Sequence, residues 1–384
     1  MNICIATSSF PINRKEIYHH YIEDLIKILL ENTHTVTILT QDKKGEKENL
    51  FSNVEVIWFP WKMTEKNVLA EISLRKYKNI ISTFSLLFNG IKYCRKLTKE
   101  KNIDIFICHW IIPSGFYVFI KNIFFARTPY ILWSLGSDVY KYKNNIFTRM
   151  ILKFIINNSK AVFADGYELC EIIKEISKKD CLFLPTFHEI EVPENIEHSE
   201  NKEKQTTSFL YVGRLSHVKG IDILINAFKY LNKNHNPNFI CNIVGDGELL
   251  QSLSEMVKHN NLENKIFFKG RIADNGKLSE FFLNADCVLL PSRSESIPIV
   301  LSEALQFNLP LIVTDVGDMG KIVNENNIGY VVPSPEHILF AEALARFIKN
   351  PVRLDKNKTN DITKKLLFKY NYQCLLDSLN LIEN

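Results

Sequence analysis

The segment from Asp286 to Asp315 constrains the fold of this chain more than any other stretch. Its sequence, DCVLLPSRSESIPIVLSEALQFNLPLIVTD, contains two short apolar runs of strand length, Val288–Leu290 and Leu311–Val313. Between them, apolar residues recur at helical spacing from Val300 to Phe307, and Pro298 suits the first turn of that helix. Strand, loop, helix and strand form the repeating unit of a parallel sheet, so the segment predicts an α/β fold.

Two glutamates stand out in this segment. Glu295 lies in the loop that follows the first strand, and Glu303 lies on the helix eight positions later. Helical side chains tilt toward the N-terminus, so both carboxylates are expected near one crevice. The N–H groups of Ser296 and Ile297 attract an anion there. Carboxylates next to a phosphate need neutral donors such as sugar hydroxyls; the alternative is that both glutamates are solvated charges.

A second strand-to-helix turn carries two cations. The strand Phe209–Val212 is followed by GRLSHVKG, and apolar residues at helical spacing come next. Arg214 and Lys219 therefore flank a turn bounded by Gly213 and Gly220, whose glycines allow close backbone approach. Together the two cations would neutralise a diphosphate; surface solvation is the alternative for either one alone.

Four motifs in order give a specific resemblance. FLYVGRLSHVKGIDILINAF begins at residue 209, IVGDGELL at 243 and IFFKGRI at 266, and the glutamate pair is followed by TDVGDMGKIV and GYVVP. This half of the chain resembles the nucleotide-sugar-binding half of family 4 retaining glycosyltransferases of the GT-B fold. The family more often has Gly where Ser296 stands.

The resemblance implies a role for each matched residue. Glu295 would contact the hydroxyls of the donor sugar and Glu303 the ribose, while Arg214 and Lys219 would bind the diphosphate. Glu295, Arg214 and Lys219 would also take part in catalysis. The loop at Arg271 and Ile272 would bind the base, mostly through its backbone. The donor site would comprise Gly213, Arg214, Lys219, Gly245, Arg271, Ile272, Glu295, Ser296, Ile297 and Glu303.

The N-terminal half alternates strands with helices, which predicts a second doubly wound parallel sheet. Its strands are expected at 3–6, 36–39, 54–59, 103–108, 130–133, 161–164 and 182–184. We therefore expect two Rossmann-like domains that face a central cleft. The predicted organisation is an N-terminal acceptor-binding domain, a polar linker, a nucleotide-sugar-binding domain and a final helix that returns to the first domain, over 1–187, 188–207, 208–365 and about 366–384.

The N-terminal half resembles the family more loosely. Phe10 and Pro11 follow the first strand, like the family loop that faces the donor phosphates, but the glycines often found downstream are absent. His109 begins a stretch similar to a frequent acceptor-side motif. That histidine is either a structural hydrogen-bonding residue or a catalytic one.

A third loop of this half is similar to the family's His-Gly-Ser-Asp loop. It contains Gly136, Ser137 and Asp138, and Leu135 stands where histidine is usual. Because that histidine normally touches the donor sugar, its absence is the most serious mismatch. For Asp138 we favour capping of the following helix over catalysis. The acceptor side would thus comprise Phe10, Pro11, His109, Gly136, Ser137 and Asp138.

Composition and charge indicate a globular protein whose N-terminal half meets an anionic partner. The chain of 384 residues is 46% hydrophobic and 23% charged, which are globular values, and its eight cysteines include no C-x-x-C pair. We see no signal peptide and no membrane span, and expect a cytoplasmic protein with reduced thiols. Residues 1–185 carry 26 Lys and Arg against 18 Asp and Glu, which suits an anionic partner for this half.

Residues 68–101 form a basic helical stretch with two interpretations. They pack on a core with a solvated basic face, or they contact the anionic inner face of the cytoplasmic membrane and bring the enzyme to a lipid-linked acceptor.

The function predicted from all of this is a hexosyltransferase. It would move a sugar from a nucleotide diphosphate sugar, UDP rather than GDP, to a hydroxyl of a bacterial surface glycan or lipid-linked acceptor. Retention of configuration is implied by the resemblance. No Asp-x-Asp stands among the matched motifs, so we expect no metal and no cofactor, and no nucleic acid partner. The alternatives are a relative such as a UDP-N-acetylglucosamine 2-epimerase, or a non-catalytic nucleotide-sugar-binding partner subunit.

Overall fold

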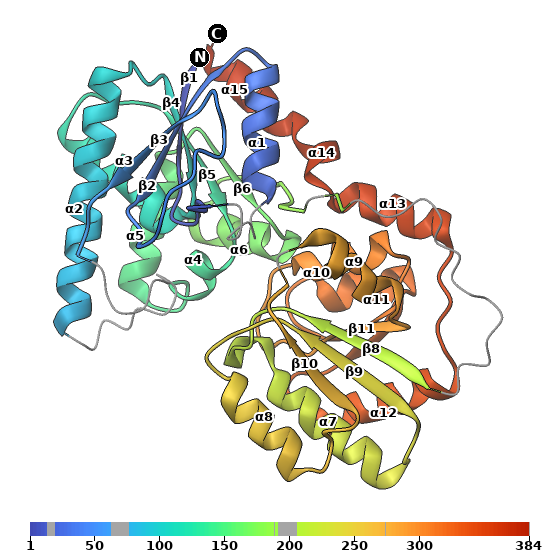
Figure 1. Ribbon diagram of the computed structural model, residues 1–384. Coiled ribbons are helices and arrows are strands. Elements are labelled where there is room, and N and C mark those ends of the chain that lie inside the picture. Colours follow the sequence, from blue (N-terminus) through green and yellow to red (C-terminus); the bar gives the residue numbers. More distant parts are fainter. Residues whose placement is uncertain (14–19, 63–76, 188, 191–205, 273, 384) are drawn as a thin grey trace. The chain divides into compact units, whose positions relative to one another are not determined.

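The structure, a computed structural model, forms two compact units and describes residues 1–13, 20–62, 77–187, 189–190, 206–272 and 274–383 (Figure 1). Unit 1 comprises Met1–His188 with Phe368–Asn384, and unit 2 comprises Glu189–Leu367. Most of the predicted linker, 188–207, lies outside the described residues, as do residues 68–76 of the basic stretch.

Unit 1 is built on a seven-stranded parallel sheet with the order β3-β2-β1-β4-β5-β6-β7. The seven strands predicted for this half are confirmed. Their bounds are β1 (Asn2–Ala6), β2 (Thr35–Gln41), β3 (Glu55–Phe59), β4 (Ile105–His109), β5 (Tyr130–Ser134), β6 (Ala161–Ala164) and β7 (Leu182–Phe183).

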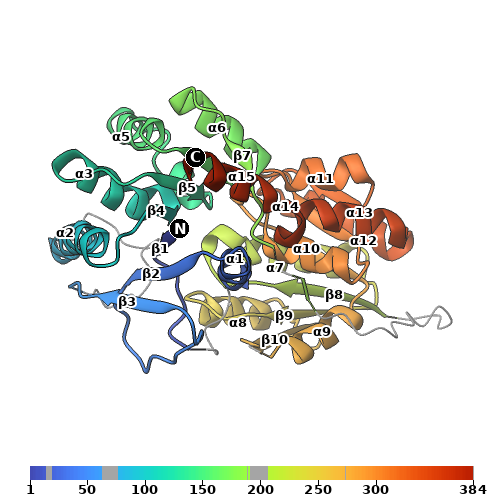
Figure 2. The same ribbon diagram turned by 90° about the horizontal axis from the view of Figure 1, so that it is seen from above.

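Helices cover both faces of this sheet. One face carries α2 (Tyr77–Glu100), α3 (Phe116–Phe124), α5 (Ile146–Asn157) and α6 (Tyr167–Ser177), and the other carries α1 (His20–Glu31) and α15 (Gln373–Glu383) (Figure 2). Because both faces are covered, β4 and β5 are buried along their whole length. Two short helical segments follow strand ends, η3 (Trp110–Gly115) and α4 (Ser137–Tyr140).

The C-terminal tail is broken where one helix was predicted. Helix α13 (Lys356–Leu366) belongs to unit 2, whereas α14 (Phe368–Asn371) and α15 belong to unit 1. The break at Leu367 is stabilised by a backbone hydrogen bond from Phe368 N–H to Phe187 O at 2.9 Å. Phe368 stacks on Trp133, with ring centroids 5.5 Å apart, and so joins the tail to the core of unit 1.

Unit 2 has a six-stranded parallel sheet with the order β10-β9-β8-β11-β12-β13. Its strands are β8 (Thr207–Val212), β9 (Phe239–Val244), β10 (Ile266–Gly270), β11 (Cys287–Leu290), β12 (Leu311–Thr314) and β13 (Gly329–Val332). Helices α7 (Ile221–Asn234), α8 (Leu250–His259) and α12 (His337–Lys349) cover one face (Figure 1). The other face carries α9 (Asn275–Leu283), α10 (Ile299–Gln306) and α11 (Met319–Asn326).

Candidate functional site

The order of the strands in the unit 2 sheet reverses at β8. This strand comes first along the chain but lies between β9 and β11, so the loops that follow β8 and β11 leave the same edge of the sheet side by side. Ligands of open α/β sheets bind at such a point. The loop after β8 contains Arg214 and Lys219, and the loop after β11 contains Glu295.

Lys219 and Glu295 form an ion pair between these two loops. The Nζ atom of Lys219 donates to Oε1 of Glu295, and the hydroxyl of Ser292 lies 3.2 Å from the same oxygen. The two side chains are 30% and 14% exposed, so the pair is accessible but shielded. The sequence predicted both residues as donor-site groups, and the structure places them in direct contact.

Two glycines allow neighbouring segments to approach the Glu295 loop closely. Gly220 has φ +68, and a Cβ there would lie 1.9 Å from the carbonyl oxygen of Pro291. Gly317, with φ +54, lies under the other end of the loop, where a Cβ would meet the carbonyl oxygen of Glu295 at 2.2 Å. Any larger residue at either position would push the Glu295 loop away.

A second ion pair fastens the same two loops and was not predicted. Both guanidinium ends of Arg293 bind the Asp222 carboxylate, at 2.7 Å and 2.6 Å, and Nη1 also donates to the carbonyl oxygen of His217 at 2.8 Å. The backbone N–H of Arg293 donates to Val218 O at 2.7 Å. Arg293 therefore joins the Glu295 loop to η4 (His217–Lys219) and to the first turn of α7.

The start of α10 lies next to Glu295. The helix begins at Ile299, and Pro298 precedes it with extended backbone angles (φ −73, ψ 140), which corrects its predicted place in the first turn. Ser296 is 8% exposed, and its hydroxyl has no hydrogen-bond partner among the described residues. A buried hydroxyl without a partner is costly, so it favours a polar ligand here. Ile297 is also buried, and Glu303 lies half-buried on α10.

The remaining predicted donor-site residues lie in neighbouring loops. Arg214 is exposed and lies 3.6 Å from the carboxylate of Glu248. Gly213 and Gly245 directly follow β8 and β9, and a Cβ on Gly245 would meet Gly213 O at 1.8 Å. Arg271 is exposed and Ile272 is half-buried directly after β10.

In unit 1, His109 lies inside the core. It is fully buried, and its ring lies 5.5 Å from that of Tyr21 and 5.2 Å from that of Trp133, centroid to centroid. Aromatic rings therefore pack against the His109 ring, which has no exposed surface. Phe10 and Pro11 are buried as well, and the Phe10 ring packs near Trp58.

Asp138 is buried and holds the loop after β4. Its carboxylate accepts hydrogen bonds from Ile111 N–H at 2.6 Å and from the Ser134 hydroxyl at 2.8 Å. The residue lies inside α4, so it does not cap that helix as predicted; the cap position belongs to Gly136, with φ 87 and no side-chain bond. Burial raises the pKa of Asp138 to about 6, and the two hydrogen bonds oppose that rise. Ser137 is exposed.

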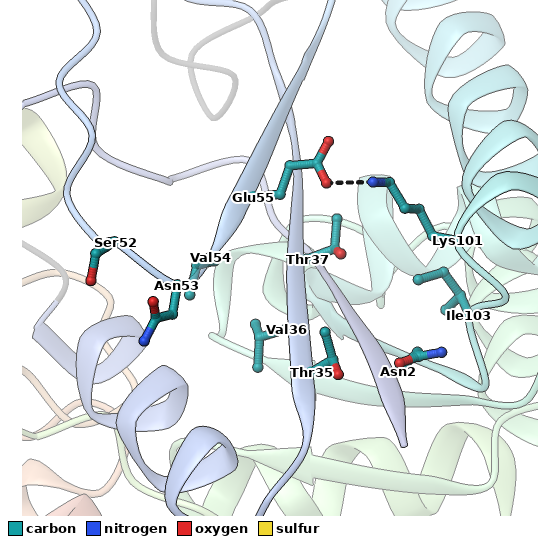
Figure 3. Close-up of a pocket in the computed structure, with 10 residues that line it drawn as sticks. All are labelled: Asn2, Thr35, Val36, Thr37, Ser52, Asn53, Val54, Glu55, Lys101 and Ile103. Atoms are coloured by element: carbon teal, nitrogen blue, oxygen red, sulfur yellow. Dashed lines mark ion pairs between the residues drawn. The ribbon is translucent and has the colours of Figure 1, made fainter.

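A hollow of about 410 Å³ opens at the other end of the unit 1 strands (Figure 3). It is lined by Asn2, Thr35 and Asn53 at the amino ends of the strands, and Lys101 pairs with Glu55 at its rim, at 2.7 Å. Ligands of parallel sheets bind at the carboxyl ends of the strands. We therefore assign no substrate role to this hollow.

The described ranges contain neither a metal-binding group nor a membrane-spanning helix. Within those residues, no three His, Cys, Asp or Glu side chains gather as a metal-binding group would require. Within the same ranges, no helix has both the length and the apolar content needed to cross a membrane.

Comparison with known proteins agrees with this arrangement. The family described as Glycosyl transferases group 1 matches residues 193–365, and the family described as Glycosyl transferase 4-like matches residues 13–166. An uncharacterized glycosyltransferase of Methanocaldococcus jannaschii is 27% identical over 360 residues, which cover 94% of this chain and 86% of the relative.

Two further proteins are informative. A Campylobacter jejuni enzyme, GalNAc-alpha-(1->4)-GalNAc-alpha-(1->3)-diNAcBac-PP-undecaprenol alpha-1,4-N-acetyl-D-galactosaminyltransferase, is 26% identical over 75% of this chain and 76% of the enzyme. The structure of Anabaena HepE in complex with UDP-glucose is similar with a TM-score of 0.71 at 15% identity, over 99% of each chain. The chain is therefore a glycosyltransferase of the group 1 and 4-like families, with the two Rossmann-like domains of the GT-B fold.

Proposed function

We propose that this enzyme transfers a sugar from a nucleotide diphosphate sugar, with UDP preferred over GDP, to a hydroxyl of a bacterial surface glycan or lipid-linked glycan, and retains the anomeric configuration. The contact between Lys219 and Glu295 at the switch point of the unit 2 sheet carries the proposal. Two similar proteins support it: the HepE structure contains UDP-glucose, and the Campylobacter relative acts on an undecaprenol-linked glycan.

The chemistry asks for positive charge at the leaving group. The bond between the anomeric carbon and the diphosphate oxygen breaks, and the electron pair stays on the diphosphate. Lys219, Arg214 and the N–H groups of Ser296 and Ile297 can neutralise the charge that develops there. The acceptor oxygen then bonds to the anomeric carbon, and its proton passes to the leaving diphosphate.

The ion pair also indicates how the two charges are held before a donor binds. Without a ligand, each charge of Lys219 and Glu295 compensates the other, so neither is left uncompensated in a shielded position. When the donor binds, its diphosphate replaces Glu295 as the partner of Lys219. The freed Glu295 carboxylate then accepts hydrogen bonds from the sugar hydroxyls, and Glu303 those of the ribose.

The proposal includes catalysis without a divalent ion, because side chains and helix N–H groups supply the positive charge. Activity measured in EDTA is expected to equal activity measured with added Mg²⁺ or Mn²⁺. A strict requirement for either ion would contradict this part of the proposal.

The deciding experiment measures nucleotide release from UDP- and GDP-sugars, with and without glycan acceptors, for the wild type and for Lys219→Ala and Glu295→Gln. Both variants are expected to lose activity by about 100-fold or more. Lys258→Ala and Glu263→Gln, which change exposed charges elsewhere in unit 2, are matched controls. The anomeric configuration of the product, read by NMR, tests retention.

Other outcomes would overturn the proposal. Donor binding without turnover on any acceptor would favour a non-catalytic nucleotide-sugar-binding partner subunit. Leu135, at the position where the family usually has histidine, is the residue that suggests this alternative. Isomerisation of the donor sugar without glycoside formation would favour an epimerase.

A further inference from the structure

One side of unit 1 exposes large apolar side chains. Helices α2, α3 and α5 lie next to one another on one face of the sheet (Figures 1 and 2). Their outward side chains include phenylalanines whose exposure to water is unfavourable. Phe84 and Phe88 are each 70% exposed, and Phe147 is 74% exposed. Large exposed apolar side chains on neighbouring helices indicate an interaction surface.

Helix α5 is amphipathic in two directions. Leu152, Ile155 and Ile156 pack into the core. The opposite side exposes a second apolar stripe at positions i, i+1, i+4, i+5 and i+8, formed by Ile146, Phe147, Met150, Ile151 and Phe154. A helix that is apolar on the side away from its own core needs a second partner.

Helix α2 divides along its length. Its first half exposes Ile80, Phe84 and Phe88 at successive i+4 positions, which align them on one face. Its second half exposes cations instead, among them Lys92 and Arg95. We call the outward faces of α2, α3 and α5 the α2–α5 surface.

The end of α3 adds exposed apolar side chains next to the cationic half of α2. Ile123, Phe124 and Phe125 are exposed there, at 56%, 70% and 38%. The guanidinium of Arg95 on α2 lies 4.1 Å from the centre of the Phe125 ring. A cation of α2 thus lies against an aromatic ring that follows α3.

Charge decides what this surface can bind. Residues 80–160 contain twelve Lys and Arg, of which Lys121 is buried, and three Asp and Glu. None of these acids disturbs the patch: Asp138 is buried, Asp104 accepts a hydrogen bond from Asn2 N–H, and Glu100 lies 3.7 Å from Lys96. Helices α3 and α5 contain no acidic residue, and Arg149 and Lys153 border the exposed stripe of α5.

We propose that the α2–α5 surface binds an anionic phospholipid bilayer, with the apolar stripes of α2 and α5 inserted at the headgroup level and the flanking cations on the lipid phosphates. Apolar residues bordered by Lys and Arg match that interface, where hydrophobic burial and attraction to anionic lipid add together. The use of this contact, to bring a lipid-linked acceptor to the enzyme, rests on the proposed function, whereas bilayer binding itself does not.

The test is flotation of the full chain with vesicles of phosphatidylcholine alone or with phosphatidylglycerol, without donor or acceptor. We expect binding only to the vesicles that contain phosphatidylglycerol, weakened by added salt. Phe84→Ser and Phe147→Ser should each weaken binding by about tenfold or more. Arg149→Glu and Lys153→Glu should each weaken it by about fivefold or more.

Matched controls lie outside the surface. Leu381→Ser changes an 82% exposed leucine on α15, on the other side of the sheet, and Lys258→Glu reverses an exposed charge in unit 2. Both should bind vesicles as the wild type does. All variants change exposed side chains, so their circular dichroism and melting temperatures should match the wild type.

Three results would overturn the inference. The wild type would fail to bind phosphatidylglycerol vesicles, or the controls would lose binding as much as the α2 and α5 variants. A dimer in solution that Phe84→Ser and Phe147→Ser dissociate would show that a second copy covers the surface. Because no step requires nucleotide, failure here would leave sugar transfer untouched, and failure of sugar transfer would leave vesicle binding intact.

Discussion

Arg293 grips the carboxylate of Asp222 with both ends of its guanidinium group, Nη1 to Oδ1 at 2.7 Å and Nη2 to Oδ2 at 2.6 Å. The two residues are 71 positions apart: Asp222 lies in the first turn of α7, shortly after Lys219, and Arg293 lies in the same loop as Glu295. Paired planar groups fix orientation as well as distance. The ion pair therefore holds the two proposed donor-site charges in register.

Replacement of Arg293 by lysine tests this positioning role. Lysine keeps the charge but cannot form two parallel hydrogen bonds, so the loops lose their fixed spacing. We expect kcat to fall by about tenfold or more, with a smaller change in KM, because the geometry matters most in the transition state. The side chains are 24% and 35% exposed, so the stability cost should be only about 1 kcal/mol.

The control for Arg293→Lys is a double variant that also contains Asp222→Asn. Asp222→Asn should lower kcat to a similar extent, and the double variant should be no worse than either single one, since all three remove one interaction. Additive losses in kcat would contradict a shared positioning role.

The contact between Lys219 and Glu295 makes a prediction that separates stability from activity. Lys219→Met leaves the shielded carboxylate of Glu295 without its cation. We expect the unfolding free energy of unit 2 to fall by about 1 to 2 kcal/mol. Lys219→Met with Glu295→Gln should recover most of that stability, because no uncompensated charge remains. Activity should stay at least 100-fold reduced in both.

Hydrogen–deuterium exchange is the suitable measurement, since it reports unit 2 peptides separately. All four tryptophans lie in the part of the sequence that forms unit 1, so their fluorescence does not report on unit 2. Equal protection in the single and double variants would contradict the compensation argument.

Local patterns were sufficient for much of this structure. The strands of unit 1 are short apolar runs bounded by turns, and the runs are buried because helices cover both faces of the sheet. Lys219 and Glu295 were predicted because each lies between a recognisable strand and the helix that follows it. Residues at the carboxyl ends of adjacent parallel strands must come close, so their proximity follows from the topology.

Contacts between distant segments were beyond the same reasoning. His109 was placed among ligand-facing candidates because it ends a strand, but Tyr21 from α1 and Trp133 from β5 enclose it. Arg293 lies in the segment 286–315, but the sequence predicts no role for it, because a single arginine in a loop is usually solvated. Only the fold shows that Asp222 lies opposite it.

Gly220 offers a test of the close packing between the loops. Alanine there combines a strained backbone, φ +68, with a Cβ 1.9 Å from Pro291 O, and that backbone atom cannot move without moving the Glu295 loop. We expect a loss of about 3 kcal/mol or more in unit 2 stability. Activity should fall with it. Gly276→Ala is the matched control, because Gly276 lies exposed in α9 and should be neutral or slightly stabilising.

Asp138 predicts a specific pH dependence of unit 1. Its pKa of about 6 in the folded chain lies above the value of about 3.9 in an unfolded chain, so the folded state holds the proton more tightly. The stabilisation is therefore complete below pH about 4 and is lost as the pH rises to about 6. Compared with Asp138→Asn, the wild type should lose on the order of 2 to 3 kcal/mol of unfolding free energy across that window.

Urea unfolding followed by tryptophan fluorescence measures this difference, because the tryptophans all belong to unit 1. Asp377→Asn, an exposed change on α15, controls for the general effect of replacing aspartate by asparagine. Asparagine at 138 can still accept the Ile111 N–H, so the variant should fold and bind donor normally. A difference between wild type and Asp138→Asn that stays constant from pH 4 to pH 7 would show that the buried carboxyl does not titrate in this range.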